Sequence, residues 1–254
     1  MAVAIAVLFG LTFGSFLTVV VHRTPRREAI GRGRSRCPSC GATLTWRDNI
    51  PLVSYLVLRG RCRHCGARIS VRYPLIELGT AALFVAAVVR YQDDAVAAVI
   101  APFLGLLLAL GLVDVEHRII PNAVVYPAIP LFAAAVVALD LAGRAASAVD
   151  AGIGFLAFGG GLFLIALIRP GGMGMGDVKL AGLIGLVLGS QGIAVVGVAA
   201  ALGILAGGVG GAVALAAGRS GKSAMPFGPF LAAGAIVAAL WGRQIADAYL
   251  SLLT

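Results

Sequence analysis

Eight apolar stretches, separated by short polar connections, constrain the fold of this chain more than any other feature. They cover residues 2–21, 74–89, 96–113, 123–141, 149–168, 178–189, 192–217 and 226–241. Most are long enough for a helix to cross a hydrocarbon layer about 30 Å thick. The stretch 178–189 is short for that purpose, so we expect it to borrow flanking residues or to lie against a cavity. The pattern predicts an all-α polytopic membrane protein with about eight transmembrane helices.

The composition excludes a water-soluble fold. Hydrophobic residues make up 60% of the 254 residues, charged residues only 12%, and the mean hydropathy is +0.99. Soluble domains average about half apolar and about a quarter charged residues, so a bilayer must act as the solvent for much of this surface. Small residues let membrane helices approach closely, and the spacing of Gly203, Gly207 and Gly211 predicts such packing in the stretch 192–217.

The basic residues predict the orientation in the membrane. If the N-terminus lies outside the cytoplasm, the connections after the first, third, fifth and seventh helices are cytoplasmic, and they hold 17 of the 20 Lys and Arg. Only Arg90, Arg144 and Arg243 fall on the other side. Cytoplasmic loops are enriched in Lys and Arg, so topology accounts for the net charge of +9 and we expect no nucleic-acid partner.

The first apolar stretch has two interpretations. A cleaved signal peptide would carry basic residues before its apolar core, whereas here His22 and Arg23 follow it. This order favours an uncleaved first helix. We therefore divide the chain into a first transmembrane helix at 1–21, a polar cytoplasmic domain at 22–73, and a membrane-embedded core at 74–254.

All four cysteines lie in the polar domain, in two Cys-x-x-Cys pairs. They are Cys37, Cys40, Cys62 and Cys65. Two such pairs supply the four thiolates of a tetrahedral structural zinc site, whereas disulfides are disfavoured in the reducing cytosol. With four thiolates the metal has no open position, so we predict a structural Zn²⁺ that stabilises a small zinc-knuckle domain between the first two helices.

Two of the eleven acidic residues stand apart from the rest. Asp114 ends a long apolar run, and Asp177 begins another within Gly174-Met-Gly-Asp-Val-Lys. Both are expected at the cytoplasmic edge of the bilayer, where ionisable groups are usually functional or paired. Glycines at 171, 172, 174 and 176 leave room for a substrate backbone near Asp177. Two neighbouring carboxylates that share one proton can activate water against a peptide carbonyl.

The residues themselves leave alternatives open for these acids. Asp114 could form an ion pair with Arg118, and Asp177 could cap the helix that follows it. A cation transporter that uses both aspartates as ligands is a further alternative, although transporters usually place polar groups near the bilayer midplane. Glu77 is expected either to pair with Arg72 or to belong to a site.

Motifs along nearly the whole chain resemble those of the type IV prepilin peptidases, the leader peptidase/N-methyltransferases. They include Gly14-Ser-Phe, both cysteine pairs, Trp46 with Asn49-Ile-Pro, Tyr73-Pro with Glu77, the Asp114 segment ending in Ile-Pro-Asn122, Gly-Met-Gly-Asp177-Val-Lys, and Phe227-Gly-Pro-Phe. The resemblance implies a bacterial cytoplasmic-membrane aspartyl protease with Asp114 and Asp177 as its catalytic pair. Its substrates would be prepilins or pseudopilins, cleaved at the cytoplasmic face after the glycine that ends a basic leader.

The resemblance also implies a second activity, which is N-methylation of the new amino terminus with S-adenosylmethionine. The residues that bind this cofactor are left unassigned, as is the oligomeric state. The chain departs from the family pattern at Thr18, where Asn is usual, and at Ala81, where Gly is usual. Because both departures lie in the half associated with methylation, a protease without methyltransferase activity is the alternative.

Overall fold

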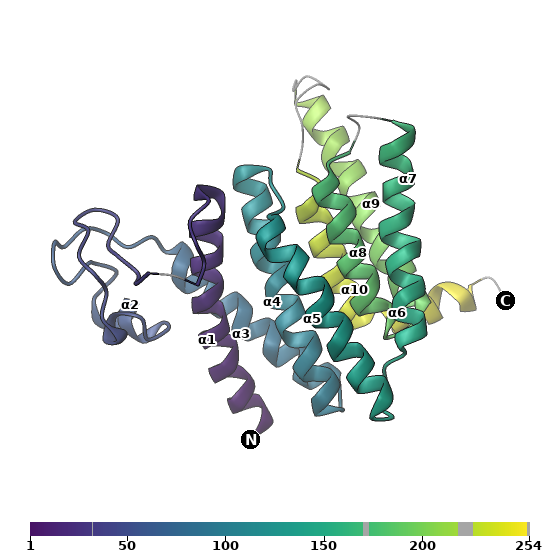
Figure 1. Cartoon of the computed structure of the whole chain (residues 1–254), viewed down its shortest axis with the longest axis horizontal. Coiled ribbons are helices and arrows are strands. Elements are labelled where there is room, and N and C mark those ends of the chain that lie inside the picture. The colour runs from purple at the N-terminus through teal and green to yellow at the C-terminus, as the bar shows by residue number, and fades with distance from the viewer. Residues whose placement is uncertain (32, 170–172, 218–225, 253–254) are drawn as a thin grey trace.

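The computed structural model describes residues 1–31, 33–169, 173–217 and 226–252, and its regular elements there are helices. The membrane helices are α1 (Ala2–Arg23), α3 (Arg72–Arg90), α4 (Asp94–His117), α5 (Asn122–Leu141), α6 (Ala148–Gly154), α7 (Gly161–Ile168), α8 (Met175–Gly189), α9 (Ile193–Ala216) and α10 (Gly228–Ser251). A π-helical turn, Phe155–Gly160, joins α6 to α7 in one continuous rod. Figure 1 shows these helices side by side in one bundle, with residues 24–71 beside it.

Seven helical rods of the described ranges are long and apolar enough to cross a membrane. They are α1, α3, α4, α5, the rod from α6 to α7, α9 and α10. The eighth predicted stretch forms α8, whose 15 residues extend about 22 Å. The prediction of an all-helical polytopic protein is confirmed. The stretch 178–189, which we expected to be short for a membrane span, forms the short helix α8.

The short helix α8 lies in the interior of the bundle. Every residue from Leu180 to Gly189 is buried, because α5, α6, α9 and α10 all contact α8. Its backbone touches the α6 rod directly. A Cβ added at Gly154 would lie 2.3 Å from the carbonyl oxygen of Gly185. Such contacts hold α8 by close packing rather than by matching the bilayer thickness.

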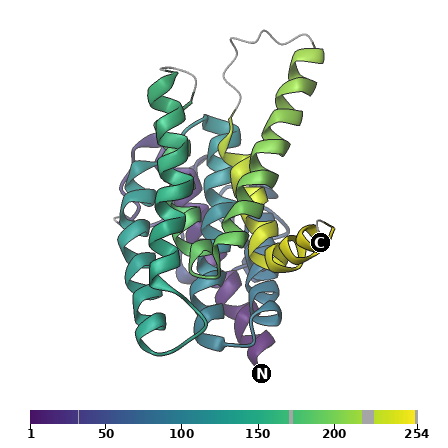
Figure 2. The same cartoon turned by 90° about the vertical axis from the view of Figure 1, so that its right-hand side faces the viewer.

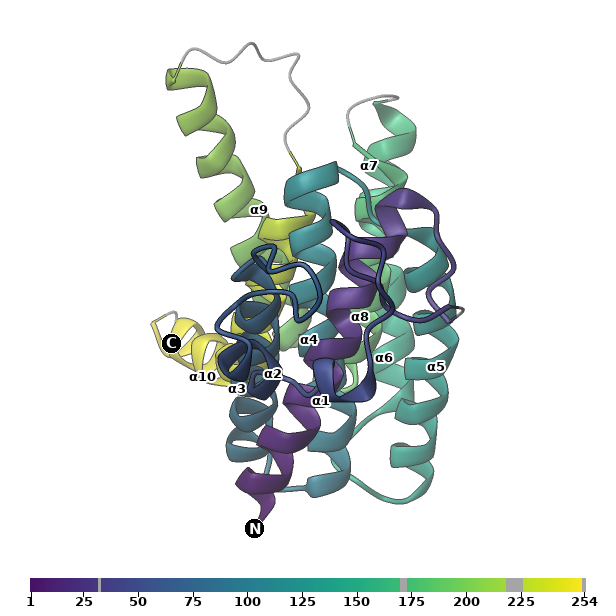
Figure 3. The same cartoon turned by 90° about the vertical axis from the view of Figure 1, so that its left-hand side faces the viewer.

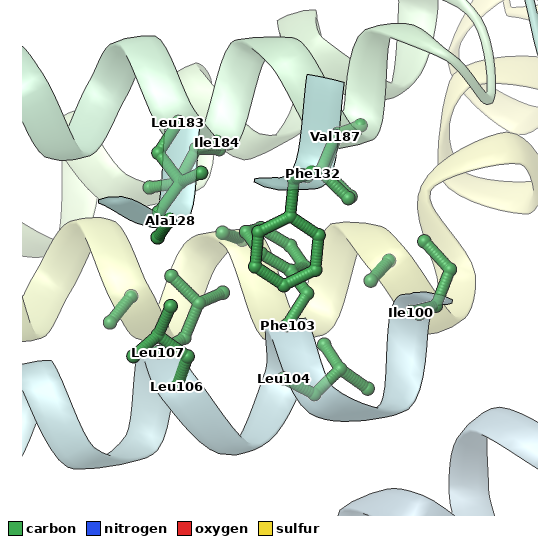
Figure 4. Close-up of a cluster of buried hydrophobic side chains, with 14 of the residues drawn as sticks. Ile100, Phe103, Leu104, Leu106, Leu107, Ala128, Phe132, Leu183, Ile184 and Val187 are labelled. Carbon is green, nitrogen blue, oxygen red and sulfur yellow. The ribbon is translucent and has the colours of Figure 1, made fainter. Parts of the chain in front are cut away.

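A tightly packed apolar layer joins α4, α5 and α8. Phe103 of α4 is fully buried and meets Phe132 of α5 edge to face, with ring centroids 5.7 Å apart. Figure 4 shows these rings among side chains of α4 and α8, including Leu107 and Ile184. This layer lies between the two ends of the membrane helices, and it fixes the spacing of α4 relative to α8.

The polar segment, residues 24–71, contains only short helices and turns in its described part. They are η1 (Thr24–Arg26), η2 (Trp46–Asp48) and α2 (Val53–Val57). Figure 3 shows this segment in front of α1 and α3, outside the bundle. Helix α3 begins at Arg72, two residues before residue 74, where we predicted the membrane-embedded core to start.

The last helix is longer than we predicted. The apolar stretch ends at residue 241, yet α10 continues to Ser251. Its C-terminal turns lead away from the bundle, as Figure 2 shows most clearly. Its N-terminal half packs closely on α9, where a Cβ added at Gly234 would lie 2.6 Å from the backbone nitrogen of Gly203. The prediction of close packing at Gly203 is thereby confirmed.

Candidate active site and metal centre

Asp114 lies in the last turn of α4, and both its backbone and its side chain are engaged. Arg118 adopts a left-handed conformation with φ of 54°, and its N–H donates to the Asp114 carbonyl at 2.8 Å, which ends the helix. The Asp114 carboxylate is buried and accepts the N–H of Gly228 at 3.1 Å. Asp114 therefore forms no ion pair with Arg118 among the described residues, and the first amide of α10 is its partner.

Asp177 is the third residue of α8, so a second helix begins beside an acid. Gly174 is the N-cap residue, and its carbonyl accepts the Asp177 N–H at 3.0 Å. A Cβ at Gly174 would lie 3.3 Å from the carboxylate oxygen Oδ2, and one at Gly176 would lie 3.0 Å from Ile120 Cβ. These two glycines leave space around the acid as predicted. The glycines at 171 and 172 lie outside the described residues.

Asp114 and Asp177 line the same cavity, which has a volume of about 260 Å³. Its other lining residues are Arg118, Ile119, Ile120, Asn122, Gly174, Gly176 and Lys179. The C-terminal end of α4, the connection to α5 and the first turn of α8 thus meet at one end of the bundle. The α10 N-terminus adds its Gly228 amide there. Helix N-termini stabilise negative charge, and two of them converge on this pair of carboxylates.

Lys179 links α8 to α5 at the edge of this cavity. Its ammonium donates to Asn122 Oδ1 at 2.5 Å and lies 4.8 Å from the centre of the Tyr126 ring. The combination of a hydrogen bond and a cation–π contact holds the start of α5 against the first turns of α8. Both residues belong to the motifs around the two aspartates, but a separation of 57 positions along the chain gives no signal that they are in contact.

The four cysteine sulfur atoms come together in the polar segment. All lie within 4.8 Å of one another, and Cys37 Sγ is 3.9 Å from Cys65 Sγ. A tetrahedral ion with Zn–S bonds of about 2.3 Å requires sulfur atoms about 3.8 Å apart. The donor set and its spacing therefore fit the predicted metal centre of four thiolates.

The two cysteine pairs have matching backbone geometry. Gly41 donates to the Cys37 carbonyl and Gly66 to the Cys62 carbonyl, each at 2.9 Å, and both glycines have φ of +70°. This left-handed conformation is open to glycine without strain. N–H groups of Cys40 and then Ser39 lower the pKa of the Cys37 thiol to about 6. A thiol of low pKa is a thiolate at neutral pH, which is the form that binds metal.

A buried carboxylate joins the polar segment to the bundle. Glu77 of α3 is only 8% exposed, and its Oε2 accepts the Leu52 N–H at 2.8 Å. Leu52 has φ of 59° and ψ of −48°, and the turn around it closes with a hydrogen bond from Val53 to Pro51. Such a γ-turn is rare and strained for a residue with a side chain. Glu77 thus stabilises an unfavourable backbone conformation.

Glu77 therefore binds the Leu52 amide and forms no ion pair with Arg72 among the described residues. Arg72 forms its ion pair with Glu116, two residues after Asp114. This pair connects the start of α3 with the end of α4, near the aspartate cavity. Glu77 instead lies where the bundle meets the polar segment.

Two family models match most of the chain. Residues 8–91 match the Bacterial Peptidase A24 N-terminal domain, and residues 101–218 match the type IV leader peptidase family. No solved structure matches the chain.

Curated relatives align over almost the full length. The prepilin leader peptidase/N-methyltransferase of Bacillus subtilis is 38% identical over 98% of this chain and 98% of its own length. Proteins with the same name from Pseudomonas putida and Pseudomonas aeruginosa are 35% and 36% identical. Their alignments cover 99% and 96% of this chain, and 94% and 92% of the respective relatives.

Proposed function

Because the chain belongs to the type IV leader peptidase family, we propose that it cleaves leader peptides from prepilins or pseudopilins with Asp114 and Asp177 as its catalytic pair. The observation that carries this proposal is the shared cavity of the two carboxylates. They come from distant parts of the chain, and each lies beside a helix N-terminus. A cavity that holds two acids and two basic side chains is suited to a polar peptide group and a water molecule.

In the proposed reaction the two carboxylates share one proton. The ionised carboxylate takes a proton from a water molecule while the water oxygen attacks the scissile carbonyl carbon. The protonated carboxylate donates its proton to the carbonyl oxygen. When the carbon–nitrogen bond breaks, one carboxyl donates its proton to the leaving amine. The other carboxylate takes a proton from a hydroxyl of the tetrahedral intermediate, which collapses to the new carboxyl group, so the pair again holds one proton. The amide of Gly228 keeps the Asp114 carboxylate oriented throughout.

We further propose that the cavity faces the cytoplasm and that the N-terminus lies outside. The support is the distribution of Lys and Arg, of which 17 of 20 fall on the side of the two aspartates. Alkaline phosphatase, which is active only outside the cytoplasm, can be fused after residue 144 or after residue 118. Activity at 144 and inactivity at 118 are expected, and the reverse result would overturn this orientation.

The second activity that we propose is methylation of the new amino terminus with S-adenosylmethionine. It rests on the full-length similarity to proteins named for both activities. When bound, the cofactor would supply an electrophilic methyl group to the pilin amine. We also propose that Cys37, Cys40, Cys62 and Cys65 hold a structural Zn²⁺ in domain 22–73, and that 74–254 forms the protease core.

The decisive experiment coexpresses a prepilin with wild type, Asp114→Asn or Asp177→Asn. Each variant retains the shape of the side chain but loses the shared proton, so leader removal should fall at least about 10³-fold. Both variants should remain in the membrane at wild-type levels. Continued leader removal by either well-expressed variant would refute the two-aspartate mechanism.

Mass spectrometry of the mature pilin then tests methylation separately. A mass increase of one methyl group at the amino terminus is expected when S-adenosylmethionine is present. An unmodified terminus under the same conditions would leave the peptidase proposal intact and remove the methyltransferase.

A further inference from the structure

A second cavity lies at the opposite end of the membrane bundle from the aspartate pair. It has a volume of about 330 Å³, and Arg90, Tyr91, Asp93, Gln191 and Arg243 contribute its polar lining together with Gln92. Asp93 caps the first turn of α4, whereas Asp114 lies in the last turn. A helix of 24 residues is about 36 Å long. The two cavities are therefore separated by about the thickness of the membrane.

The three basic residues that break the charge asymmetry of the chain all meet at this cavity. Arg90 and Arg243 line it, and Arg144 contacts Asp93 in its wall at 3.5 Å. They come from α3, α10 and the connection between α5 and α6. Basic residues are disfavoured on this side of a bacterial membrane protein. Their convergence on one cavity indicates a local use for positive charge.

Arg90 and Arg243 have only neutral partners among the described residues. Arg90 donates to the Leu240 carbonyl at 2.6 Å and to the Gln244 side chain at 3.2 Å. Arg243 donates two hydrogen bonds to the Gln191 carbonyl, at 3.2 and 2.8 Å. A guanidinium carries five N–H groups, so each retains donors. Asp93, the acid in the cavity wall, pairs with Arg144, and within the described ranges neither Arg90 nor Arg243 forms an ion pair.

The chain beside the cavity has the character of a helix at a lipid surface. In the part of α10 that leaves the bundle and at its C-cap, Trp241, Ile245, Tyr249 and Leu252 are all exposed. Their spacing of three or four residues places them along one side of the helix. Aromatic residues gather at membrane–water interfaces, and amphipathic helices lie in that plane. The cavity therefore opens at the depth of phospholipid headgroups.

We infer that this cavity binds the phosphate group of an anionic phospholipid, in the leaflet opposite to the aspartate pair. The forked N–H groups of arginine match phosphate oxygens. Val96, Val195 and Ala238 form an apolar floor beneath the arginines and are buried in the bundle. The cavity volume lies at the lower end of the range for small-ligand sites, about 300–1,000 Å³, which suits a headgroup rather than a whole lipid. The inference stands independently of the peptidase proposal.

Native mass spectrometry of the full-length protein from nanodiscs tests this inference. The nanodiscs contain phosphatidylcholine with or without phosphatidylglycerol, and a separate arm supplies inorganic phosphate alone. Retention of phosphatidylglycerol is expected for wild type, with an apparent dissociation constant at least about tenfold higher in Arg243→Gln, since a bidentate charge-assisted contact is lost. Arg34→Gln, which removes an exposed charge from the polar segment, should bind phosphatidylglycerol as wild type does.

A second variant keeps the test valid if Arg243→Gln fails to fold. Gln92 is an exposed residue of the cavity wall, and its side chain makes no hydrogen bond within the described ranges. Gln92→Glu therefore adds a negative charge to the cavity with little change in side-chain size. It should weaken phosphatidylglycerol binding as well. Wild-type binding by Gln92→Glu, or by a folded Arg243→Gln, would overturn the inference. Equal occupancy by inorganic phosphate without any gain from phosphatidylglycerol would overturn the lipid as the source of the phosphate.

Discussion

The cysteine centre and the aspartate cavity are built by opposite routes. The four cysteines lie within one segment, and the outermost pair, Cys37 and Cys65, is separated by 28 positions. Two turns of matching geometry orient them, so the cluster depends on local backbone structure. Asp114, by contrast, depends on Gly228, which is 114 positions away. The bundle must be assembled before its carboxylate has a partner.

This difference predicts which perturbations remain local. Loss of a cysteine should unfold the polar segment and leave the bundle intact, because the helices are stabilised by their own apolar packing. A change at α10 should disturb the aspartate cavity and leave the metal in place. The four predictions that follow test this separation, beginning with the largest effect.

Cys62→Ser should abolish metal binding and unfold the polar segment. Binding of a structural Zn²⁺ contributes about 10–16 kcal/mol to folding of small zinc domains, more than other contacts of this segment can replace. Metal analysis should fall from about one equivalent to none, and limited proteolysis should cut between residues 27 and 71. Ser39→Ala, inside the other knuckle, is the control. A full equivalent of zinc in Cys62→Ser would show that the four thiolates do not form the centre.

Gly228→Ala should damage catalysis without releasing the metal. A Cβ at this position would lie 2.7 Å from Asp114 Oδ2 and 3.0 Å from Ile120 Cδ1, so the carboxylate must move. Displacement of a reacting group by about 1 Å costs about 10²-fold in rate, and kcat should fall while KM for prepilin changes little. Gly208→Ala in α9 is the matched control, because a Cβ there meets nothing within 4 Å. Equal loss in both variants would point to general helix packing instead.

Substitutions of Glu77 test the link between the two regions. Glu77→Ala removes the acceptor of the Leu52 N–H and should destabilise the strained turn by about 1.5–3 kcal/mol. Glu77→Gln keeps an acceptor oxygen and should recover most of this loss. Amide hydrogen exchange around Leu52 measures both effects. Equal protection in the alanine variant and in wild type would show that the turn does not need the carboxylate.

Asp48 should give the smallest effect. Hydrogen bonds from the Thr45 hydroxyl and then from Arg63 lower the pKa of its carboxyl to about 2. A lowered folded-state pKa stabilises the segment above the ordinary value of 3.8, and this stabilisation disappears as the pH falls towards 2. Because the Arg63 side chain is half exposed, the ion pair contributes less than about 1 kcal/mol.

Carboxyl ¹³C NMR of the full-length protein should show this titration directly. The Asp48 signal is expected to titrate below 3.8 in wild type, with Glu28→Gln as a control that leaves it unchanged. Zinc transfer to a chelator at neutral pH should be only slightly faster in Asp48→Asn. A large acceleration would mean that the cysteine centre depends on this contact more than its exposure allows.

Much of this architecture follows from amino-acid type and spacing. Runs of apolar residues predict the membrane helices because each must shield its own backbone from lipid. The repeated Cys-x-x-Cys spacing predicts the thiolate cluster because each pair is brought together by one tight turn. Asp114 and Asp177 stand out because a charged residue at the end of an apolar run is costly unless it has a use.

Contacts between helices could not be predicted in this way. The sequence suggested Arg118 as a partner for Asp114 and Arg72 as a partner for Glu77, because both are close in the chain. The structure instead joins Asp114 to Gly228 and Glu77 to Leu52. Both acceptors bind backbone amides, which every residue except proline possesses, so no side-chain pattern marks them.

The nature of the solvent, the helical class and the identity of the chemical groups are thus properties of composition and order along the chain. The burial of the short helix α8, the cavity shared by the two aspartates, and the meeting of three arginines at the other end depend on packing. They arise because close glycine contacts and interlocking apolar side chains select one arrangement of helices. Hydropathy alone does not distinguish that arrangement from others, since every membrane helix is apolar on most of its surface.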